Sequence, residues 1–453
     1  MHMVFRKTEK ALIPRRLSTC LAVALALASS GRLAHAQAVE LPKPLLDAAQ
    51  TYASTLTGGQ KIGGKVSILG VNGGRELEML KAAWAPFQAA TGIVVDYTGT
   101  TDFAAVLQTR VQAGDPPDLA GSTNINNLVR YAKRGALKDV GAMIGDASLQ
   151  GKFDPGLLNA ASVNGKIYGV WTELNNFMVW YNAHTYDGPK DNPTWEQFDA
   201  WAVRRAAAGK TPWCYTDERG ASSGAIAGNW IQAYILKNSG PKTLQGLADG
   251  SISWTAPEVK AAFEAFGKIA LDPKMVPGGP VAAMSTPAVK IGTGLFYEPP
   301  QCSVLLWGTY AYGVTSIIYP KIKPIEDLDF MPVPGKPENA NYETFGGTLY
   351  LAFRDTPQVK AFLSYLVSDQ AQKLVASAGN WTVASQAIQP SDYSNPVLKR
   401  ARETLLKPGV TLVAQPTQVV DPPVIQAFWK GIVQYVLDPN SLDEVLQSID
   451  AAK

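Results

Sequence analysis

Residues 65–97, KVSILGVNGGRELEMLKAAWAPFQAATGIVVDY, decide the fold class of this chain. Their first six residues form a short apolar run that is typical of a strand and leads into a glycine-rich turn. Apolar residues then recur at helical spacing, which predicts a helix over residues 76–90 with a kink at Pro86. The apolar run at residues 93–97 predicts the next strand. This order of strand, helix and strand indicates an α/β fold with a parallel sheet and helices on both faces.

The same alternation continues along the chain. Helices are predicted over residues 103–113 and 125–134, and three later helices begin at the capping residues Thr194, Thr356 and Ser441. The length of 453 residues favours two or three domains. A composition with 46% hydrophobic and 17% charged residues is that of a globular protein, which argues against bulk disorder and against a coiled coil.

The N-terminus has the layout of a secretory signal peptide. A basic segment ends at Arg16, an uncharged apolar run covers residues 17–30, and small residues frame a cleavage site after Ala36. The apolar run is short for a membrane span, although an N-terminal anchor is the alternative interpretation. Cys20 stands at the start of the run, whereas a lipidated cysteine would follow it. We therefore expect an exported, soluble protein.

Removal of this segment changes the charge of the protein. The whole chain has 41 basic and 38 acidic residues and a formal charge of +3. The first 36 residues hold six of the basic residues and one acidic residue, so 35 basic and 37 acidic residues remain, a net charge of −2. A near-neutral protein lacks the excess of Lys and Arg with which nucleic-acid binders displace counterions. We therefore expect no nucleic-acid partner.

Cysteine and histidine usage limits the chemistry. Cys214 and Cys302 remain after cleavage, and an oxidising compartment makes a disulfide between them plausible, with two buried free thiols as the alternative. His184 is the only histidine left, so a Ser-His-Asp triad is excluded unless His184 is its base. No Cys or His cluster is present, and we expect no metal and no other cofactor.

Five segments in order carry a resemblance to a known family. They are TGIVV at 91–95, GDPPD at 114–118, RGALKDV at 134–140, VWYN at 179–182 and PTWEQF at 193–198. From about residue 64 to its end, the chain resembles the family 1 extracellular solute-binding proteins of ABC importers.

Further segments are similar to the subgroup of this family that binds α-glucosides. They are TPWC at 211–214, GGP at 278–280, PPQC at 299–302 and FWKG at 428–431. One departure weakens the α-glucoside assignment: the subgroup tends to have Trp after the glycine of a Ser-Gly turn, whereas Ser223-Gly224 is followed here by Ala225.

The resemblance implies a two-lobed periplasmic-binding-protein fold of type II. Each lobe would be a mainly parallel sheet flanked by helices, joined to the other by a hinge that the chain crosses near residues 172–176, 343–347 and 388–396. The expected organisation is a signal peptide at 1–36, a partly helical lead-in at 37–63 that is not essential to the core, an N-terminal lobe at 64–172 and 345–392, and a C-terminal lobe at 173–344 and 393–453.

The implied function is the capture of a sugar between the lobes. Sugars present a C–H ring face, which suits aromatic side chains, and a rim of hydroxyls, which suits carboxylates, amides and Arg. The chain has 11 Trp, 17 Tyr and 14 Phe, so many aromatic side chains are available as platforms on which a sugar ring could stack. We expect a periplasmic, monomeric binding protein without enzymatic activity that passes an α-glucoside-like di- or oligosaccharide to a membrane permease. The alternatives are a polyol or another small polar solute as ligand, a secreted carbohydrate-active enzyme, or an exported protein with a purely structural or partner-binding role.

Matching the family's motifs onto this sequence gives candidate ligand-binding residues. They are Gly74, Arg75, Glu76, Ser122, Asn124, Glu173, Trp230, Trp307, Tyr310, Gly346, Gly347, Trp381 and Trp429. Helix-end electrostatics is the alternative role for Glu76, and turn formation is the alternative for Ser122 and Asn124. Core packing is the alternative for the aromatic residues.

Overall fold

The computed structural model describes residues 39–100 and 102–453. Residues 39–453 form one compact unit. The predicted signal peptide and its cleavage after Ala36 lie outside the described residues. Across the part of the chain that is described, none of the helices combines the length and apolar character that a membrane span needs.

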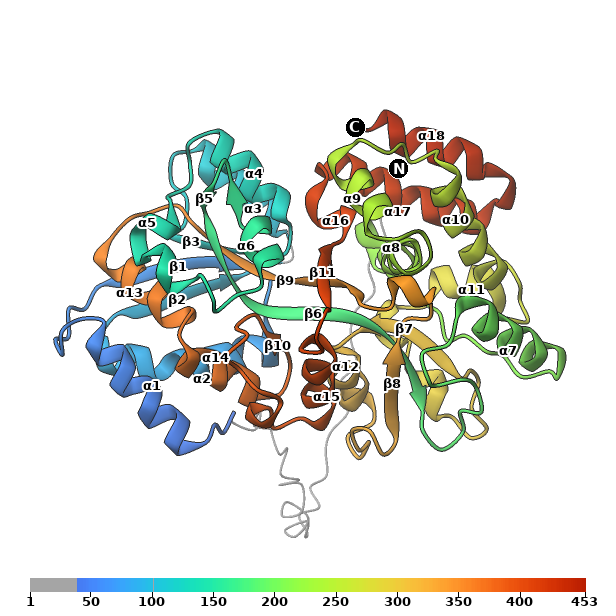
Figure 1. The fold of residues 1–453 in the computed structure, drawn as a ribbon, viewed down its shortest axis with the longest axis horizontal. Coiled ribbons are helices and arrows are strands. Elements are labelled where there is room, and N and C mark those ends of the chain that lie inside the picture. Colours follow the sequence, from blue (N-terminus) through green and yellow to red (C-terminus); the bar gives the residue numbers. More distant parts are fainter. Residues whose placement is uncertain (1–38, 101) are drawn as a thin grey trace, which may run out of the picture. The chain divides into compact units, whose positions relative to one another are not determined.

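The first part of the chain alternates strands and helices as predicted (Figure 1). Its elements are α1 (Lys43–Thr55), β1 (Lys65–Gly70), α2 (Gly74–Thr91), β2 (Val94–Gly99), α3 (Phe103–Gln112), β3 (Leu119–Ser122), α4 (Ile125–Lys133), α5 (Val140–Ile144), α6 (Pro155–Ala160), β4 (Ser162–Val163) and β5 (Lys166–Ile167). β1 lies between β2 and β3 and pairs with both in parallel. α2 extends through Pro86 and ends at Gly92, whose φ of +69° suits glycine.

A long strand, β6 (Gly169–Asn182), leads into the second part of the chain. The elements that follow are α7 (Trp195–Ala207), α8 (Ala225–Ser239), α9 (Pro241–Asp249), α10 (Pro257–Ala270), α11 (Gly279–Ser285), β7 (Val304–Gly308), α12 (Ala311–Ile318) and β8 (Leu328–Pro332). The chain then returns along β9 (Tyr342–Ala352) to α13 (Pro357–Leu366), α14 (Asp369–Ala378) and β10 (Thr382–Val383). It ends with α15 (Pro396–Leu405), β11 (Thr411–Ala414), α16 (Pro416–Val419), α17 (Pro422–Leu437) and α18 (Leu442–Ala451).

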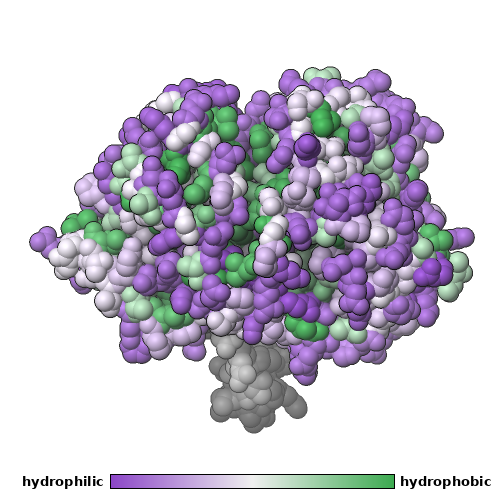
Figure 2. Space-filling model, in the orientation of Figure 1, coloured by the Kyte–Doolittle hydropathy of each residue, from purple (hydrophilic) through white to green (hydrophobic). Residues whose placement is uncertain are grey.

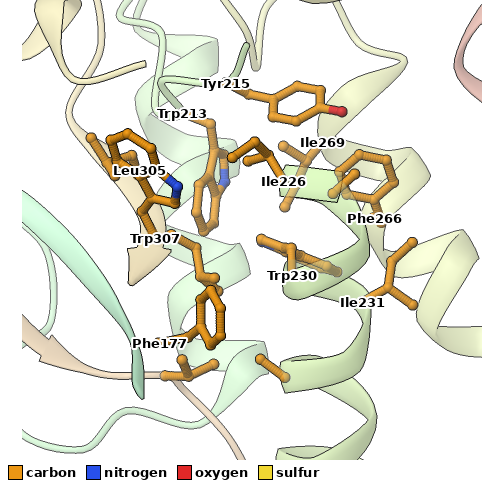
Figure 3. Packing of buried hydrophobic residues seen from close by; sticks show 14 of the residues in the cluster. Phe177, Trp213, Tyr215, Ile226, Trp230, Ile231, Phe266, Ile269, Leu305 and Trp307 are labelled. Carbon is orange, nitrogen blue, oxygen red and sulfur yellow. The ribbon is translucent and has the colours of Figure 1, made fainter. Parts of the chain in front are cut away.

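Two separate hydrophobic cores divide this unit into two halves. The N-terminal core draws on α1 to β5, the first half of β6, and β9 to β10. Trp84 and Phe87 of α2 meet Phe362 of α13 there, with ring centroids 5.7 and 5.1 Å apart. The C-terminal core draws on the second half of β6, α7 to β8, and α17 to α18. Trp213, Trp230 and Phe266 pack together in it (Figure 3).

β6 and β9 connect the two halves. They pair antiparallel from Gly169 opposite Leu351 to Asn176 opposite Phe345, and the rest of β6 pairs antiparallel with β7 and β8. The alternation of strands and helices did not predict these antiparallel pairs. On β6, Leu174 belongs to the N-terminal core and Phe177 to the C-terminal core, so the strand changes core at residues 174–177, next to the first predicted crossing.

Two expectations meet clear answers. The lead-in is partly helical, and its helix contributes to the core that it was not expected to need: Ala49 and Ala53 of α1 are fully buried, and α1 packs on α2 and α14. Small residues four apart let this helix approach its neighbours closely. The predicted disulfide is confirmed: Cys214 and Cys302 are bonded, with Cα atoms 5.2 Å apart.

Candidate ligand-binding site

Polar side chains gather where β1 and β2 end and α2 begins. The backbone N–H of Asn72 donates to the hydroxyl of Tyr97 at 3.0 Å, and that hydroxyl lies 3.3 Å from Oδ1 of Asn72. Gly70 leaves room for the Tyr97 ring, since a Cβ on this glycine would overlap the ring. The carboxyl ends of parallel strands in an α/β sheet are the usual place for a ligand, so this edge is a candidate site.

Glu76 is held at this edge by two amides. Asn72 donates from Nδ2 to Oε2 of Glu76 at 3.4 Å, and Asn380 donates to Oε1 at 3.3 Å. The carboxylate is exposed and stands in the first turn of α2, where the helix dipole favours a negative charge. Of its predicted neighbours, Gly74 has a φ of +50°, and Arg75 forms an exposed ion pair with Glu78 at 3.7 Å.

Glu173 lies on β6 beside this group and is only 2% exposed. Its carboxylate accepts a hydrogen bond from Oγ1 of Thr172 at 2.7 Å and another from Thr348. Burial raises the pKa of Glu173 to about 7, and the negative charge of Glu76 acts in the same direction. The Glu173 carboxyl therefore changes from a hydrogen-bond donor to an acceptor as the pH rises through neutrality. The hydroxyl of Tyr350 is buried without a partner and lies close enough to Glu173 for that charge to raise its own pKa.

Ser122 and Asn124 are occupied by local contacts. The Ser122 hydroxyl donates to the carbonyl of Asn124 at 2.9 Å and accepts from Asn127 at 3.0 Å. Oδ1 of Asn124 accepts from the backbone N–H of Asn126 at 2.8 Å and so caps α4. These contacts agree with the turn-forming alternative, and a ligand contact from either residue stays a prediction.

Tyr310 of the C-terminal half is the next predicted site residue. It is half-buried at the start of α12 and meets Trp307 edge-on, with ring centroids 5.2 Å apart. Burial raises the pKa of Tyr310 to about 12, with the charges of Arg219 lowering it and of Glu76 raising it. Tyr310 thus lies within electrostatic range of one charged group from each half. Gly308 makes room for it, because a Cβ there would overlap the Tyr310 ring.

The Phe428-Trp429 pair is divided between core and surface. Phe428 is fully buried against Trp254, at a centroid distance of 4.9 Å, whereas Trp429 is half-buried. Trp429 lies over the start of α8, where a Cβ on Gly224 would overlap its backbone. A half-exposed indole at this place suits the stacking role predicted for Trp429.

Three of the predicted aromatic site residues are buried in the hydrophobic cores. Trp230 is 5% exposed and stacks on Tyr234 at 5.5 Å with ring planes 9° apart, edge-on to Trp195. Figure 3 shows it enclosed by Trp213, Phe266 and Ile231. Trp381 is buried in the N-terminal core. Trp307 is 5% exposed and lies in the C-terminal core. The burial of these three residues agrees with the core-packing alternative, and a ligand contact from any of them stays a prediction.

The two predicted glycines of β9 lie where strands and loops approach closely. A Cβ on Gly347 would overlap the carbonyl oxygen of Glu173 on β6. A Cβ on Gly346 would lie 3.0 Å from Nε2 of Gln418. Gln418 is 8% exposed and its Oε1 has no partner. A buried amide oxygen without a partner costs free energy that a ligand hydroxyl would recover.

Sequence reasoning missed several of these residues. They are Asn72, Tyr97, Arg219, Asn380 and Gln418. Asn72 carries a local signal, since it follows a predicted strand and precedes two glycines. The others reach the site only through pairings between distant segments, which no local pattern encodes.

One cavity lies apart from this group. A cavity of about 670 Å³ in the C-terminal half is lined by residues that include His184, Tyr297 and Tyr319, and none of the predicted site residues lines it.

Within residues 39–100 and 102–453, no group of three or more His, Cys, Asp and Glu side chains could hold a metal ion. On the face drawn in Figure 2 the surface is mostly hydrophilic, and hydrophobic residues are visible in a recess between the two halves.

Comparisons with known proteins agree with this geometry. The family model described as bacterial extracellular solute-binding protein matches residues 73–373. The osmoprotective compounds-binding protein GgtB of Synechocystis sp. is 30% identical over 376 residues, which cover 82% of this chain and 88% of that protein. The alpha-glucosides-binding periplasmic protein AglE of Rhizobium meliloti is 27% identical over 402 residues, which cover 84% of this chain and 85% of that protein.

Solved structures share the fold. A chitin oligosaccharide binding protein superposes with a TM-score of 0.69 at 20% identity, over 86% of this chain and 98% of that chain. Maltose-bound T. maritima MalE3 superposes with a TM-score of 0.65 at 19% identity, over 86% and 98% of the two chains. The two-lobed fold predicted from the sequence is confirmed by these similarities.

Proposed function

Because the chain belongs to the family of bacterial extracellular solute-binding proteins, we propose that it captures a di- or oligosaccharide of the α-glucoside kind for an ABC importer. The observation that supports this proposal is that Tyr310 lies within electrostatic range of Glu76 from the N-terminal half and of Arg219 from the C-terminal half. Carboxylate, guanidinium and amide groups suit the hydroxyl rim of a sugar, and the rings of Tyr310 and Trp429 suit its C–H face.

The proposed mechanism is binding without chemistry. An open form meets the solute, both lobes contact it, and their combined interactions favour the closed form, which a membrane permease then recognises. The N-terminal lobe in this scheme spans residues 64–172 and 345–392, and the C-terminal lobe spans residues 173–344 and 393–453. The protein acts as a periplasmic monomer after cleavage behind Ala36. Both curated relatives named above are binding proteins, which supports a function without catalysis.

A polyol or another small polar solute is the second candidate. The relative GgtB is named for osmoprotective compounds, and Ala225 stands where the α-glucoside subgroup tends to have Trp. A site with one platform fewer suits a smaller solute.

A thermal-shift screen tests the proposal. A ligand that binds only the native state at one hundred times its Kd adds about 2.7 kcal/mol to the free energy of unfolding, so it must raise the Tm. We expect maltose, trehalose or a longer α-glucoside to raise the Tm, and amino acids to leave it unchanged. A shift with polyols alone would favour the second candidate. Sustained hydrolysis of p-nitrophenyl glucosides would contradict a binding function.

A further inference from the structure

One side-chain hydrogen bond between the two halves lies at the start of two helices. Asn126 of α4 donates from Nδ2 to Oδ1 of Asp421, which directly precedes α17, at 2.5 Å. α4 adds Ile125 and Leu128 to the N-terminal core, and α17 adds Phe428 to the C-terminal core. The bond therefore connects side chains that belong to different cores and lie 295 residues apart.

The side chain of Asp421 makes no capping bond to its own helix. It occupies the N-cap position of α17, where an aspartate side chain usually accepts a hydrogen bond from the second or third backbone N–H of the helix. No such bond is present at α17. The first two residues of α17, Pro422 and Pro423, have no backbone N–H, so Val424 offers the one N–H at these positions that an Asp421 cap could use.

The local hydrogen bonds around Asn126 leave its side-chain amide available for the bond to Asp421. Its backbone N–H is bonded to the side chain of Asn124, which caps α4, so its amide group is left to reach outward. Ser122 holds this turn through its bond to the carbonyl of Asn124. Asn126 is 8% exposed, so the amide that meets Asp421 is largely shielded from water.

The segment before Asp421 also lies between the halves. Val419 packs against the N-terminal core and Val420 against the C-terminal core, and α16 contacts α4. Gln418 in the same segment reaches Gly346 at the candidate site. The Asn126–Asp421 bond therefore lies three residues along the chain from Gln418, whose side chain contributes to the candidate site.

We propose that Asn126 and Asp421 form a latch that favours the closed arrangement of the two lobes before any solute is bound, an inference that rests on the proposed function for its biological meaning. A hydrogen bond to a charged group is stronger than one between neutral groups, and in this bond Asn126 is buried whereas Asp421 is exposed. A latch of this strength leaves the open form accessible, so solute still enters. It raises the fraction of molecules that are ready to hold solute, and apparent affinity rises in proportion to that fraction.

Small-angle X-ray scattering of the ligand-free protein tests the latch directly. We expect Asn126→Ala and Asp421→Ala each to increase the radius of gyration, and the double variant to add little, because both changes remove the same bond. Asp421→Ser restores a good N-cap to α17 but is too short to reach Asn126, so it should also increase the radius of gyration while the protein stays folded. Asp438→Ala is the matched control, since Asp438 caps a short helix within the C-terminal half and its side chain accepts a hydrogen bond from the backbone N–H of Asn440.

Unchanged radii of gyration in all the latch variants would overturn the latch, and so would an equal increase in Asp438→Ala. A calorimetric titration with maltose then separates this inference from the proposed function. If maltose binds, the latch variants should bind it about five- to tenfold more weakly than the unmodified protein. If neither maltose nor another sugar binds, the proposed function fails while the scattering result still decides the latch.

Discussion

Lys237 and Glu343 form an ion pair of 2.8 Å between Nζ and Oε1, with their side chains only 3% and 5% exposed. Lys237 lies near the end of α8, and Glu343 lies at the start of β9, the strand that returns to the N-terminal half. The Lys237 ammonium also donates to the carbonyl of Ala340 at 3.1 Å. Burial raises the pKa of Glu343, and the Lys237 charge opposes that effect. The pair therefore ties α8 to the strand on which the second predicted crossing lies.

Removing one partner of this pair should destabilise the protein strongly. Lys237→Met leaves the Glu343 carboxylate buried without its counter-charge, and such changes cost about 3–5 kcal/mol. Chemical denaturation measures the change in the free energy of unfolding. The double variant Lys237→Met/Glu343→Met has no unpaired charge and should recover much of the loss. Equal destabilisation by the single and double variants would contradict this account of the pair.

Glu173 should make stability depend on pH. Its pKa in the folded state is about 7, above the ordinary value of 4.5, so the folded protein keeps the proton that the unfolded chain releases. The stabilisation is therefore fully present below about pH 4.5 and is lost as the pH rises through 7. Glu173→Gln should remove this dependence, whose full size is at most about 3 kcal/mol.

Asp217 provides the comparison for Glu173. Burial raises its pKa to about 6, although backbone N–H groups at the start of α8 oppose the shift. The change in the free energy of unfolding caused by Asp217→Asn should therefore stop varying with pH above about pH 6. The change caused by Glu173→Gln should stop varying above about pH 7. Denaturation curves across this range measure both, and identical profiles for the two variants would contradict the assignment of the shifts.

Trp429 and Trp230 should respond differently to truncation. Trp429→Ala removes a half-buried ring and should weaken sugar binding by about 1 kcal/mol with little loss of stability. Trp230→Ala empties a core position and should cost about 3–5 kcal/mol of stability. Calorimetric titration and thermal unfolding of both variants measure the two effects. Unchanged affinity in Trp429→Ala would remove that residue from the site.

The disulfide should contribute to stability and be detectable by thiol titration. It closes a segment with a sequence separation of 88, so it restricts the unfolded chain considerably. Replacing Cys214 and Cys302 by Ser should lower the free energy of unfolding by about 2–5 kcal/mol. Titration of the unfolded, unreduced protein should find neither thiol free, and two additional free thiols would contradict the bond.

Local patterns predicted most of the N-terminal half of the fold. The helices α2, α3 and α4 and the strands β1 and β2 follow from apolar spacing and glycine stops, and these elements lie within one or two residues of expectation. The core role of α1 was missed, because its apolar face is revealed only by its packing on α2 and α14. The antiparallel pairing of β6 with β9, β7 and β8 depends on long-range topology rather than on local periodicity.

The site was predictable only where family motifs mark it. Glu173, Glu76 and Tyr310 were proposed from motifs, and the structure places them near one another. Trp230 was proposed in the same way, but a motif does not distinguish an indole that stacks on a ligand from one that packs in the core, and Trp230 is 5% exposed. Tyr97 contacts Asn72, and Asn380 contacts Glu76, only because the fold brings distant segments together. Asn380 lies 304 residues from Glu76. No local pattern marks such partners.

The central claim is that the two halves hold one sugar between them, and calorimetric titration tests it most directly. The purified protein should bind an α-glucoside such as maltose or trehalose, or a longer one, at one saturable site per chain, and Tyr310→Ala should weaken that binding at least fivefold. An absence of saturable binding for every sugar and polyol tried, in a protein shown to be folded, would contradict the account.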